Sequence, residues 1–268
     1  MYLAYWGFNE EPFQNTSDPK FFCFSEQHEE ALSRLRYAVQ EYKACALLTG
    51  IFGSGKTLLA QTLLDNLPPD KFARAFIFNP QLNSVEILRE IIYQLGIHDN
   101  LPEQKTDILH RLTDILNDNY AEGRHTVIIV DEAHLIEDRL LFEELRLLLN
   151  FQKRDKFLLT LILIGQPELR DKITHLKPFD QRVSIRFHLK GLTLEETKAY
   201  ILHRLRVAGA ARPIFEEETF TAIHESTGGI PRRINQVCDL ALLAGFGMKA
   251  QEINVSIIQE VVMDPQTL

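Results

Sequence analysis

Short apolar runs alternate with amphipathic stretches along the first two thirds of the chain. Continuous apolar runs and one alternating pattern predict five strands, at residues 44–48, 73–78, 126–130, 158–164 and within 179–189. Apolar residues at helical spacing predict the intervening helices, at residues 31–39, 58–64, 84–95, 106–120 and 143–150. Because strands that alternate with helices form parallel sheets, we expect an α/β fold whose ligands collect at the carboxyl ends of the strands.

The pattern changes after Gly191, where strand-like runs cease. Four segments with helical periodicity follow, at residues 193–208, 216–226, 231–246 and 255–263. We therefore expect two domains, an α/β domain over residues 1–190 and a helical domain over residues 191–268.

Residues 1–24 combine aromatic residues and prolines without an amphipathic period. We interpret this segment as an irregular arm. Its rings either pack as ordinary core on the body of the protein or contact the adenine ring of a nucleotide, and the sequence leaves both alternatives open.

A glycine-rich segment follows the first predicted strand and precedes a predicted helix. Gly50-Ile51-Phe52-Gly53-Ser54-Gly55-Lys56-Thr57 matches the pattern G-x-x-x-x-G-K-[ST] at every fixed position, in the strand–turn–helix context that this phosphate-binding loop requires. Glycines let the backbone curl so that its N–H groups point at phosphate oxygens. A chance glycine-rich turn is the alternative, and the full pattern in this context argues against it.

The chemistry of the motif assigns a role to its last residues. Lys56 is expected to reach the β- and γ-phosphates of ATP, and the Thr57 hydroxyl to ligate Mg²⁺. The residues expected to bind the nucleotide here are Gly50, Phe52, Gly53, Ser54, Gly55, Lys56, Thr57 and Leu58.

Two acids end the third predicted strand. Asp131 suits the Mg²⁺ shell, directly or through a water, and Glu132 is the candidate to polarise the attacking water. Either acid could instead cap the helix that follows. With His134 the run spells DEAH, the signature of one helicase group. A helicase of that group needs two tandem motor domains, and the residues that follow this run are too few for a second one. We therefore interpret His134 as a neighbour of the site rather than a catalyst.

Three further polar residues lie near predicted strand ends. Gln166 follows the fourth strand, where its side chain either approaches the γ-phosphate or satisfies the next helix as a turn residue. Arg182 and Arg186 lie before or within the fifth strand and could offer a guanidinium to a neighbouring subunit's phosphate.

The amino-acid composition limits the class of protein but identifies no further site residue. The chain has 268 residues, 45% apolar and 25% charged, which is ordinary for a globular protein with a proper core. Neither a membrane-length apolar run nor a basic segment before an apolar one is found, so we expect a cytoplasmic protein, peripheral to the inner membrane only through a partner. The net charge of −8 makes a large non-specific DNA footprint less favourable. The isolated cysteines Cys23, Cys45 and Cys238 are interpreted as reduced residues in apolar surroundings.

The order of motifs resembles that of AAA+ ATPases and, more narrowly, the ExeA/GspA-type ATPases linked to secretion, pilus assembly and exosortase loci. The segments that carry the resemblance are residues 2–24 with Pro12-Phe13 and Asp18-Pro19, both nucleotide motifs, residues 144–150, 165–169, Gln181-Arg182 with Arg186, and residues 228–235. One departure is Ile51, where such loops often carry glutamate. Larger family members continue into a transmembrane segment and a peptidoglycan-binding domain, so cell-wall binding is not carried over.

The resemblance implies a P-loop NTPase core with a helical lid. It also implies that Gln166 occupies the sensor-1 position and Arg232 the nucleotide-binding sensor-2 position on the lid. Arg182 or Arg186 would be an arginine finger acting in trans, which implies a homo-oligomeric ring, with a hexamer favoured.

Three functions remain open at this point. The first is Mg-ATP hydrolysis that drives or regulates assembly of an envelope secretion or pilus apparatus. The second is a DNA-associated ATPase, similar to transposition regulators of the TniB type or to initiator-like ATPases. The third is a nucleotide-binding switch that hydrolyses slowly. The acidic balance favours the first.

Overall fold

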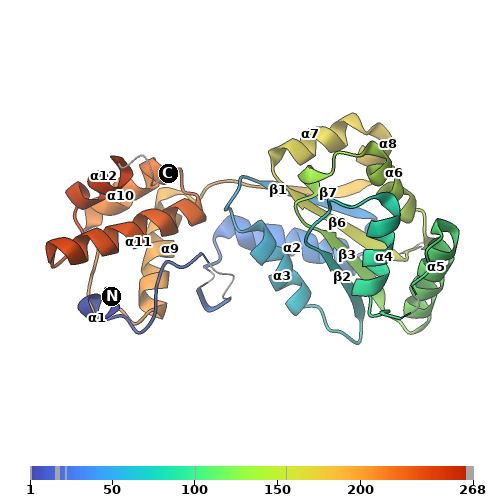
Figure 1. Cartoon of the computed structure of the whole chain (residues 1–268), viewed down its shortest axis with the longest axis horizontal. Coiled ribbons are helices and arrows are strands. Elements are labelled where there is room, and N and C mark those ends of the chain that lie inside the picture. Colours follow the sequence, from blue (N-terminus) through green and yellow to red (C-terminus); the bar gives the residue numbers. More distant parts are fainter. Residues whose placement is uncertain (1, 16–18, 22, 100, 155, 264–268) are drawn as a thin grey trace. The chain divides into compact units, whose positions relative to one another are not determined.

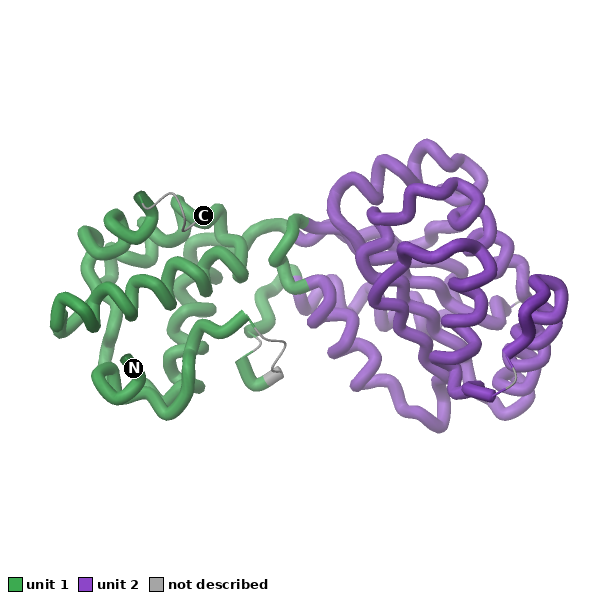
Figure 2. Tube along the Cα trace, in the orientation of Figure 1, with its two compact units in different colours: residues 1–27, 51–55, 190–268 green, residues 28–50, 56–189 purple. Residues whose placement is uncertain are grey.

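The computed structural model of the protein describes residues 2–15, 19–21, 23–99, 101–154 and 156–263. The chain forms two compact units, one of residues 28–50 and 56–189 and the other of residues 1–27, 51–55 and 190–268 (Figure 2). The larger unit holds the sheet and the smaller unit holds the C-terminal helices (Figure 1).

The larger unit is built around a five-stranded parallel sheet, which confirms the predicted fold class. The strands are β1 (Cys45–Gly50), β2 (Phe72–Ile77), β3 (His125–Val130), β6 (Leu159–Gly165) and β7 (Val183–Leu189). Their order is β2-β3-β6-β1-β7, and every neighbouring pair is parallel. The central strands β1, β3 and β6 are buried along their whole length, which explains their continuous apolar runs, whereas the edge strand β7 alternates in exposure.

Helices connect the strands. They are α2 (Glu26–Gln40), α3 (Lys56–Asp65), α4 (Ser84–Gln94), α5 (Lys105–Ala121), α6 (Arg139–Leu148), α7 (Pro167–His175) and α8 (Lys177–Asp180). A helix was expected after Gln166 without bounds, and it is α7, between β6 and β7. The sequence patterns did not predict the short antiparallel hairpin of β4 (Gln152–Lys153) and β5 (Lys156–Phe157), which departs from the alternation of strands and helices.

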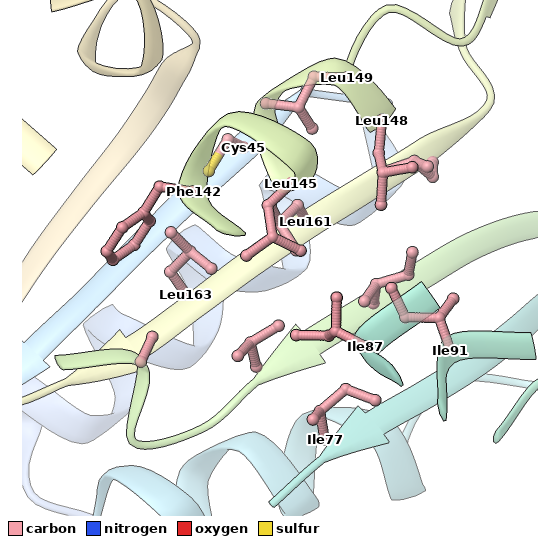
Figure 3. Close-up of a cluster of buried hydrophobic side chains, with 14 of the residues drawn as sticks. Cys45, Ile77, Ile87, Ile91, Phe142, Leu145, Leu148, Leu149, Leu161 and Leu163 are labelled. Atoms are coloured by element: carbon pink, nitrogen blue, oxygen red, sulfur yellow. The ribbon is translucent and has the colours of Figure 1, made fainter. Parts of the chain in front are cut away.

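One hydrophobic core fills the larger unit. Figure 3 shows Ile77 of β2 beside Ile87 and Ile91 of α4, and Leu161 beside Leu145 of α6. Helix α4 packs on β2, and α5 packs on α4 (Figure 1). The core therefore fixes the strands, and with them the loops at the carboxyl edge of the sheet.

A buried polar cluster lies at the opposite, amino-terminal ends of the strands. The Thr160 hydroxyl donates to the Lys43 carbonyl at 2.7 Å and lies 2.8 Å from His125 Nε2. Burial, with a smaller contribution from the neighbouring Lys156 ammonium, lowers the pKa of His125 to about 4. His125 is consequently a neutral, structural histidine.

The smaller unit packs α9 (Leu194–Val207), α10 (Glu217–Thr227), α11 (Pro231–Met248) and α12 (Val255–Met263) with the N-terminal segment, which includes α1 (Leu3–Trp6) and the 3₁₀ turn η1 (Pro19–Phe21). The rings of Trp6, Phe8 and Phe13 are buried in the core of these helices. Trp6 Nε1 donates to the Leu242 carbonyl at 3.0 Å, and Arg204 Nε donates to the Pro12 carbonyl at 2.6 Å.

Core packing, one of the two alternatives for the aromatic arm, thus accounts for these rings. The arm was expected within an α/β domain of residues 1–190, whereas in the structure it groups with the C-terminal helices. The domain division itself stays a prediction, and Asp18 and Phe22 of the arm lie outside the described residues. Among the described helices, none has the length and apolarity needed to cross a membrane.

Candidate nucleotide site

The glycine-rich loop runs from the end of β1 to the start of α3. The Ser54 N–H donates to the Ile51 carbonyl at 3.2 Å. Gly53 and Gly55 adopt φ values of +81° and +93°, in the left-handed region that favours glycine. The turn therefore needs glycine at these two motif positions, as expected of a backbone that presents N–H groups to phosphate.

Lys56 occupies the first position of α3 and is only 5% exposed. Its ammonium donates to the Gly50 carbonyl at 2.9 Å. Burial lowers the pKa of Lys56, while the carboxylates of Glu132, Asp131 and Glu168 act in the opposite direction. An anionic phosphate at this lysine would offset the cost of burying its charge.

The two nucleotide motifs meet at Thr57 and Asp131. The Thr57 hydroxyl donates to Asp131 Oδ2 at 2.6 Å, and Asp131 Oδ1 accepts the Glu132 N–H at 2.8 Å. These are the hard oxygen donors that Mg²⁺ prefers, and it is commonly held by one or two protein ligands with waters and phosphate oxygens. In the described parts of the chain no group of three or more His, Cys, Asp and Glu residues is placed to hold a metal ion, so waters and phosphate oxygens would have to complete the shell. The residues present therefore fit a magnesium ion.

Glu132 adopts an unusual backbone conformation, with φ 49° and ψ 32°. A non-glycine residue in this region costs about 1–3 kcal/mol, and such strain tends to gather at functional sites. The Glu132 side chain makes no capping bond to the 3₁₀ turn η2 (Ala133–Leu135) that follows, which disfavours the helix-cap alternative for this acid. Instead its Oε2 lies 3.2 Å from His134 Nδ1.

Gln166 follows β6 and is the N-cap residue of α7, yet its side chain makes no capping hydrogen bond. Its Nε2 lies 3.0 Å from His134 Nε2. The turn-residue alternative for this glutamine is therefore disfavoured. A Cβ on Gly165 would lie 3.1 Å from the backbone nitrogen of His134, so glycine at the end of β6 permits the close approach of these two backbone segments.

The two candidate arginine fingers make other contacts. Arg182 donates to Asn150 Oδ1 at 3.0 Å. Arg186, on the edge strand β7, donates to the carbonyl and Oδ1 of Asp180 at 3.0 and 2.7 Å. Both arginines lie toward the exposed edge of the sheet, and their role in trans stays a prediction.

Arg232 approaches the glycine-rich turn within the smaller unit. Its backbone N–H donates to the Gly53 carbonyl at 3.4 Å, and its guanidinium lies 4.7 Å from the centre of the exposed Phe52 ring. Upstream, the Leu192 N–H donates to the Gly229 carbonyl at 2.8 Å, in a backbone contact so close that a Cβ on Gly229 would lie 2.1 Å from the Leu192 carbonyl oxygen. The close contact at Gly229 therefore fixes the start of α11 and, with it, the position of Arg232.

Comparison with known proteins agrees with this geometry. Residues 39–173, about half of the chain, match the AAA domain family. The chain belongs to this family of AAA domains. The matched region contains the glycine-rich loop, Asp131, Glu132 and Gln166, but not Arg182, Arg186 or Arg232.

A curated relative of this AAA protein is General secretion pathway protein A from Aeromonas hydrophila, which is 39% identical over 260 residues. The alignment covers 94% of this chain and 46% of the relative, so the chain spans about half the length of that protein. Among solved structures, Aeropyrum pernix ORC2 in ADPNP-ADP complexes has a TM-score of 0.69 at 18% identity, covering 96% of this chain and 72% of that one. The Thermotoga maritima RuvB Holliday junction branch migration motor has a TM-score of 0.60 at 20% identity, covering 94% and 72%. These two likenesses show the fold alone.

Sequence reasoning missed parts of the site of this AAA protein. His134 was interpreted as a neighbour of the site, and the structure places its ring between Glu132 and Gln166, an arrangement that the sequence did not predict. Lys172 was not singled out, although its ammonium donates to the carbonyls of His134 and Ile136 at 2.5 and 2.9 Å. The DEAH run was the signal for the histidine; no local pattern marks the lysine.

Proposed function

We propose that the protein binds Mg-ATP and hydrolyses it. The observation that carries the proposal is the 2.6 Å hydrogen bond from the Thr57 hydroxyl to Asp131, which joins the phosphate-binding loop to the acidic strand end in a pair of oxygen donors suited to magnesium. Membership of the AAA family and the glycine-dependent turn support the same conclusion.

Each residue has a distinct part in this reaction. Lys56 and the loop N–H groups, from Gly50 to Leu58, hold the phosphates of ATP. Thr57 and Asp131 hold Mg²⁺, which neutralises charge on the β- and γ-phosphates when bound. The Glu132 carboxylate accepts a hydrogen bond from the attacking water and draws off its proton. Gln166 contacts the γ-phosphate, and Arg232 contacts the nucleotide bound to its own subunit.

The site is completed between subunits. The protein forms a homo-oligomeric ring, a hexamer, in which Arg182 or Arg186 of one subunit reaches the γ-phosphate bound to the next. The edge position of β7 supports this arrangement, because residues on an edge strand are accessible to another chain. Both arginines would have to leave their Asn150 and Asp180 contacts to act in this way.

ATP hydrolysis serves the assembly of an envelope secretion or pilus-type apparatus. The 39% identity to General secretion pathway protein A supports this role, and the protein acts in the cytoplasm, at the inner membrane only through a partner. A DNA-associated role is the second candidate: the chain shares its fold with the RuvB branch migration motor, but the net charge of −8 opposes binding to DNA. Tight, ATP-dependent binding to duplex DNA at physiological salt would favour the second candidate.

The decisive variant for hydrolysis is Glu132→Gln. The amide preserves the shape of the side chain but cannot take up a proton, so we expect ATP binding to persist and steady-state phosphate release to stop. Glu137→Gln is the matched control, because Glu137 is exposed and near in sequence. Turnover by Glu132→Gln at the rate of the control variant would contradict the assigned role.

A further inference from the structure

The imidazole of His134 lies between two residues of the proposed catalytic site and turns a different nitrogen toward each. Nδ1 lies 3.2 Å from Glu132 Oε2, and Nε2 lies 3.0 Å from Gln166 Nε2. The His134 side chain is 12% exposed, so water competes weakly for these two nitrogens. The His134 ring therefore contacts both side chains and can couple the position of one to that of the other.

Gln166 places a donor against each nitrogen of the His134 ring, and a neutral ring accepts at only one of them. The side-chain amide, at 3.0 Å from Nε2, is the closer donor. The Gln166 amide nitrogen can only donate, so Nε2 of the neutral His134 ring accepts and the ring proton lies on Nδ1. The Nδ1–H group is then the donor that faces the Glu132 carboxylate. The Gln166 backbone N–H faces Nδ1 at 3.4 Å, longer than ordinary N–H bonds of about 2.7–3.2 Å. Glu132 Oε2, 3.2 Å from the same nitrogen, is buried and accepts no hydrogen bond from the residues that the structure describes, so a proton on Nδ1 would give this oxygen a donor.

The backbone around His134 is held from two sides. The Lys172 ammonium of α7 donates to the His134 and Ile136 carbonyls, at 2.5 and 2.9 Å. On the other side, the missing Cβ of Gly165 lets the end of β6 approach the His134 nitrogen. The ring position thus follows from a fixed turn, η2, rather than from an unsupported surface rotamer.

We propose that His134 is a positioning residue that joins Gln166 to Glu132, so that a movement of the glutamine at the γ-phosphate shifts the carboxylate that activates water. The inference rests on the proposed ATPase function and deepens it. His134 neither binds the nucleotide nor transfers a proton in this account. Its loss should therefore affect turnover and leave nucleotide affinity alone.

The first test separates turnover from binding. His134→Ala is expected to lower kcat about 10²-fold, the loss typical of a misplaced catalytic group, with the ATP dissociation constant changed by less than about threefold. His134→Asn should recover part of the loss, because its amide can take the place of Nδ1 and donate to Glu132. His175→Ala is the control, since His175 is an exposed histidine on α7 that bonds to the Asp171 carbonyl. An unchanged kcat, or a loss confined to ATP affinity, would overturn the proposal.

The second test needs no turnover. The ¹⁵N spectrum of the His134 ring at pH 8 should report the tautomer with its proton on Nδ1, and the Nδ1 and Nε2 signals should shift in Glu132→Gln and Gln166→Ala respectively. A ring protonated on Nε2, or signals that ignore both substitutions, would overturn the inference even if the protein hydrolyses ATP. Conversely, the absence of ATP hydrolysis by the wild-type protein would refute the proposed function while this spectrum still reads the His134 contacts.

Discussion

Replacing Gly53 by alanine tests the glycine-rich turn and its contact with Arg232 together. Gly53 has φ +81°, and a Cβ there would lie 2.6 Å from Arg232 Cβ. The left-handed conformation costs an L-residue about 1–2 kcal/mol. The clash adds to this cost, because the facing atom is a Cβ fixed to α11 and not the end of a flexible side chain.

The expected result follows from these two terms. Gly53→Ala should lower the free energy of unfolding by at least about 1 kcal/mol, since the strain exceeds the gain of about 0.4–1 kcal/mol from stiffening the unfolded chain. If the strain is relieved by displacing the turn, ATP affinity falls instead, about tenfold for each 1.4 kcal/mol. Urea unfolding and ATP titration on the same preparations measure both quantities.

Gly247→Ala provides the matched control. Gly247 lies in α11 of the same unit, and an added Cβ meets no atom within 4 Å. Alanine should stabilise this exposed helical position by about 0.5–1 kcal/mol. The reasoning is refuted if Gly53→Ala matches wild type in both unfolding and ATP affinity.

The pKa of His125 lies near 4 in the folded protein and near 6.5 in the unfolded chain. The contribution of the neutral His125 ring to the free energy of unfolding is therefore fully present above pH 6.5 and is lost as pH falls toward 4, by about 2 kcal/mol at pH 5. His125→Gln should flatten this pH dependence in urea titrations from pH 7 to 5. Alanine at the true arginine finger, Arg182 or Arg186, should remove turnover and spare ATP affinity, with a rate loss of about 10³- to 10⁵-fold. Mixing that variant with Glu132→Gln should restore some activity, and failure to do so at subunit concentrations that form rings would argue against shared sites.

The central sheet could be predicted because parallel strands covered on both faces appear as continuous apolar runs. The hairpin β4–β5 could not, since two residues per strand are too few to establish a period. The position of the aromatic arm also escaped prediction: it depends on contacts such as Trp6 with the Leu242 carbonyl, which join residues more than two hundred positions apart.

The candidate site likewise has one part that the sequence predicts and another that it does not. The loop from Gly50 to Thr57 and the acids Asp131 and Glu132 are local motifs, and the chain brings them together by the parallel register of its strands. The bridge through His134 depends on the left-handed backbone of Glu132 and on the missing Cβ of Gly165. The DEAH run indicated a histidine near the site, but its contacts with Glu132 and Gln166 follow from these two features and could be read only from the structure.

Isothermal titration of ATP with Mg²⁺ into wild type and Lys56→Ala is the sharpest test of the proposed nucleotide site. We expect one saturable site in the wild-type protein and its loss in the variant, because the buried ammonium of Lys56 is the cation expected at the β- and γ-phosphates. Lys71→Ala, which removes an exposed lysine before β2, should bind as wild type does. Equal ATP affinity in Lys56→Ala and wild type, or no uptake of ATP by the wild-type protein, would contradict the account.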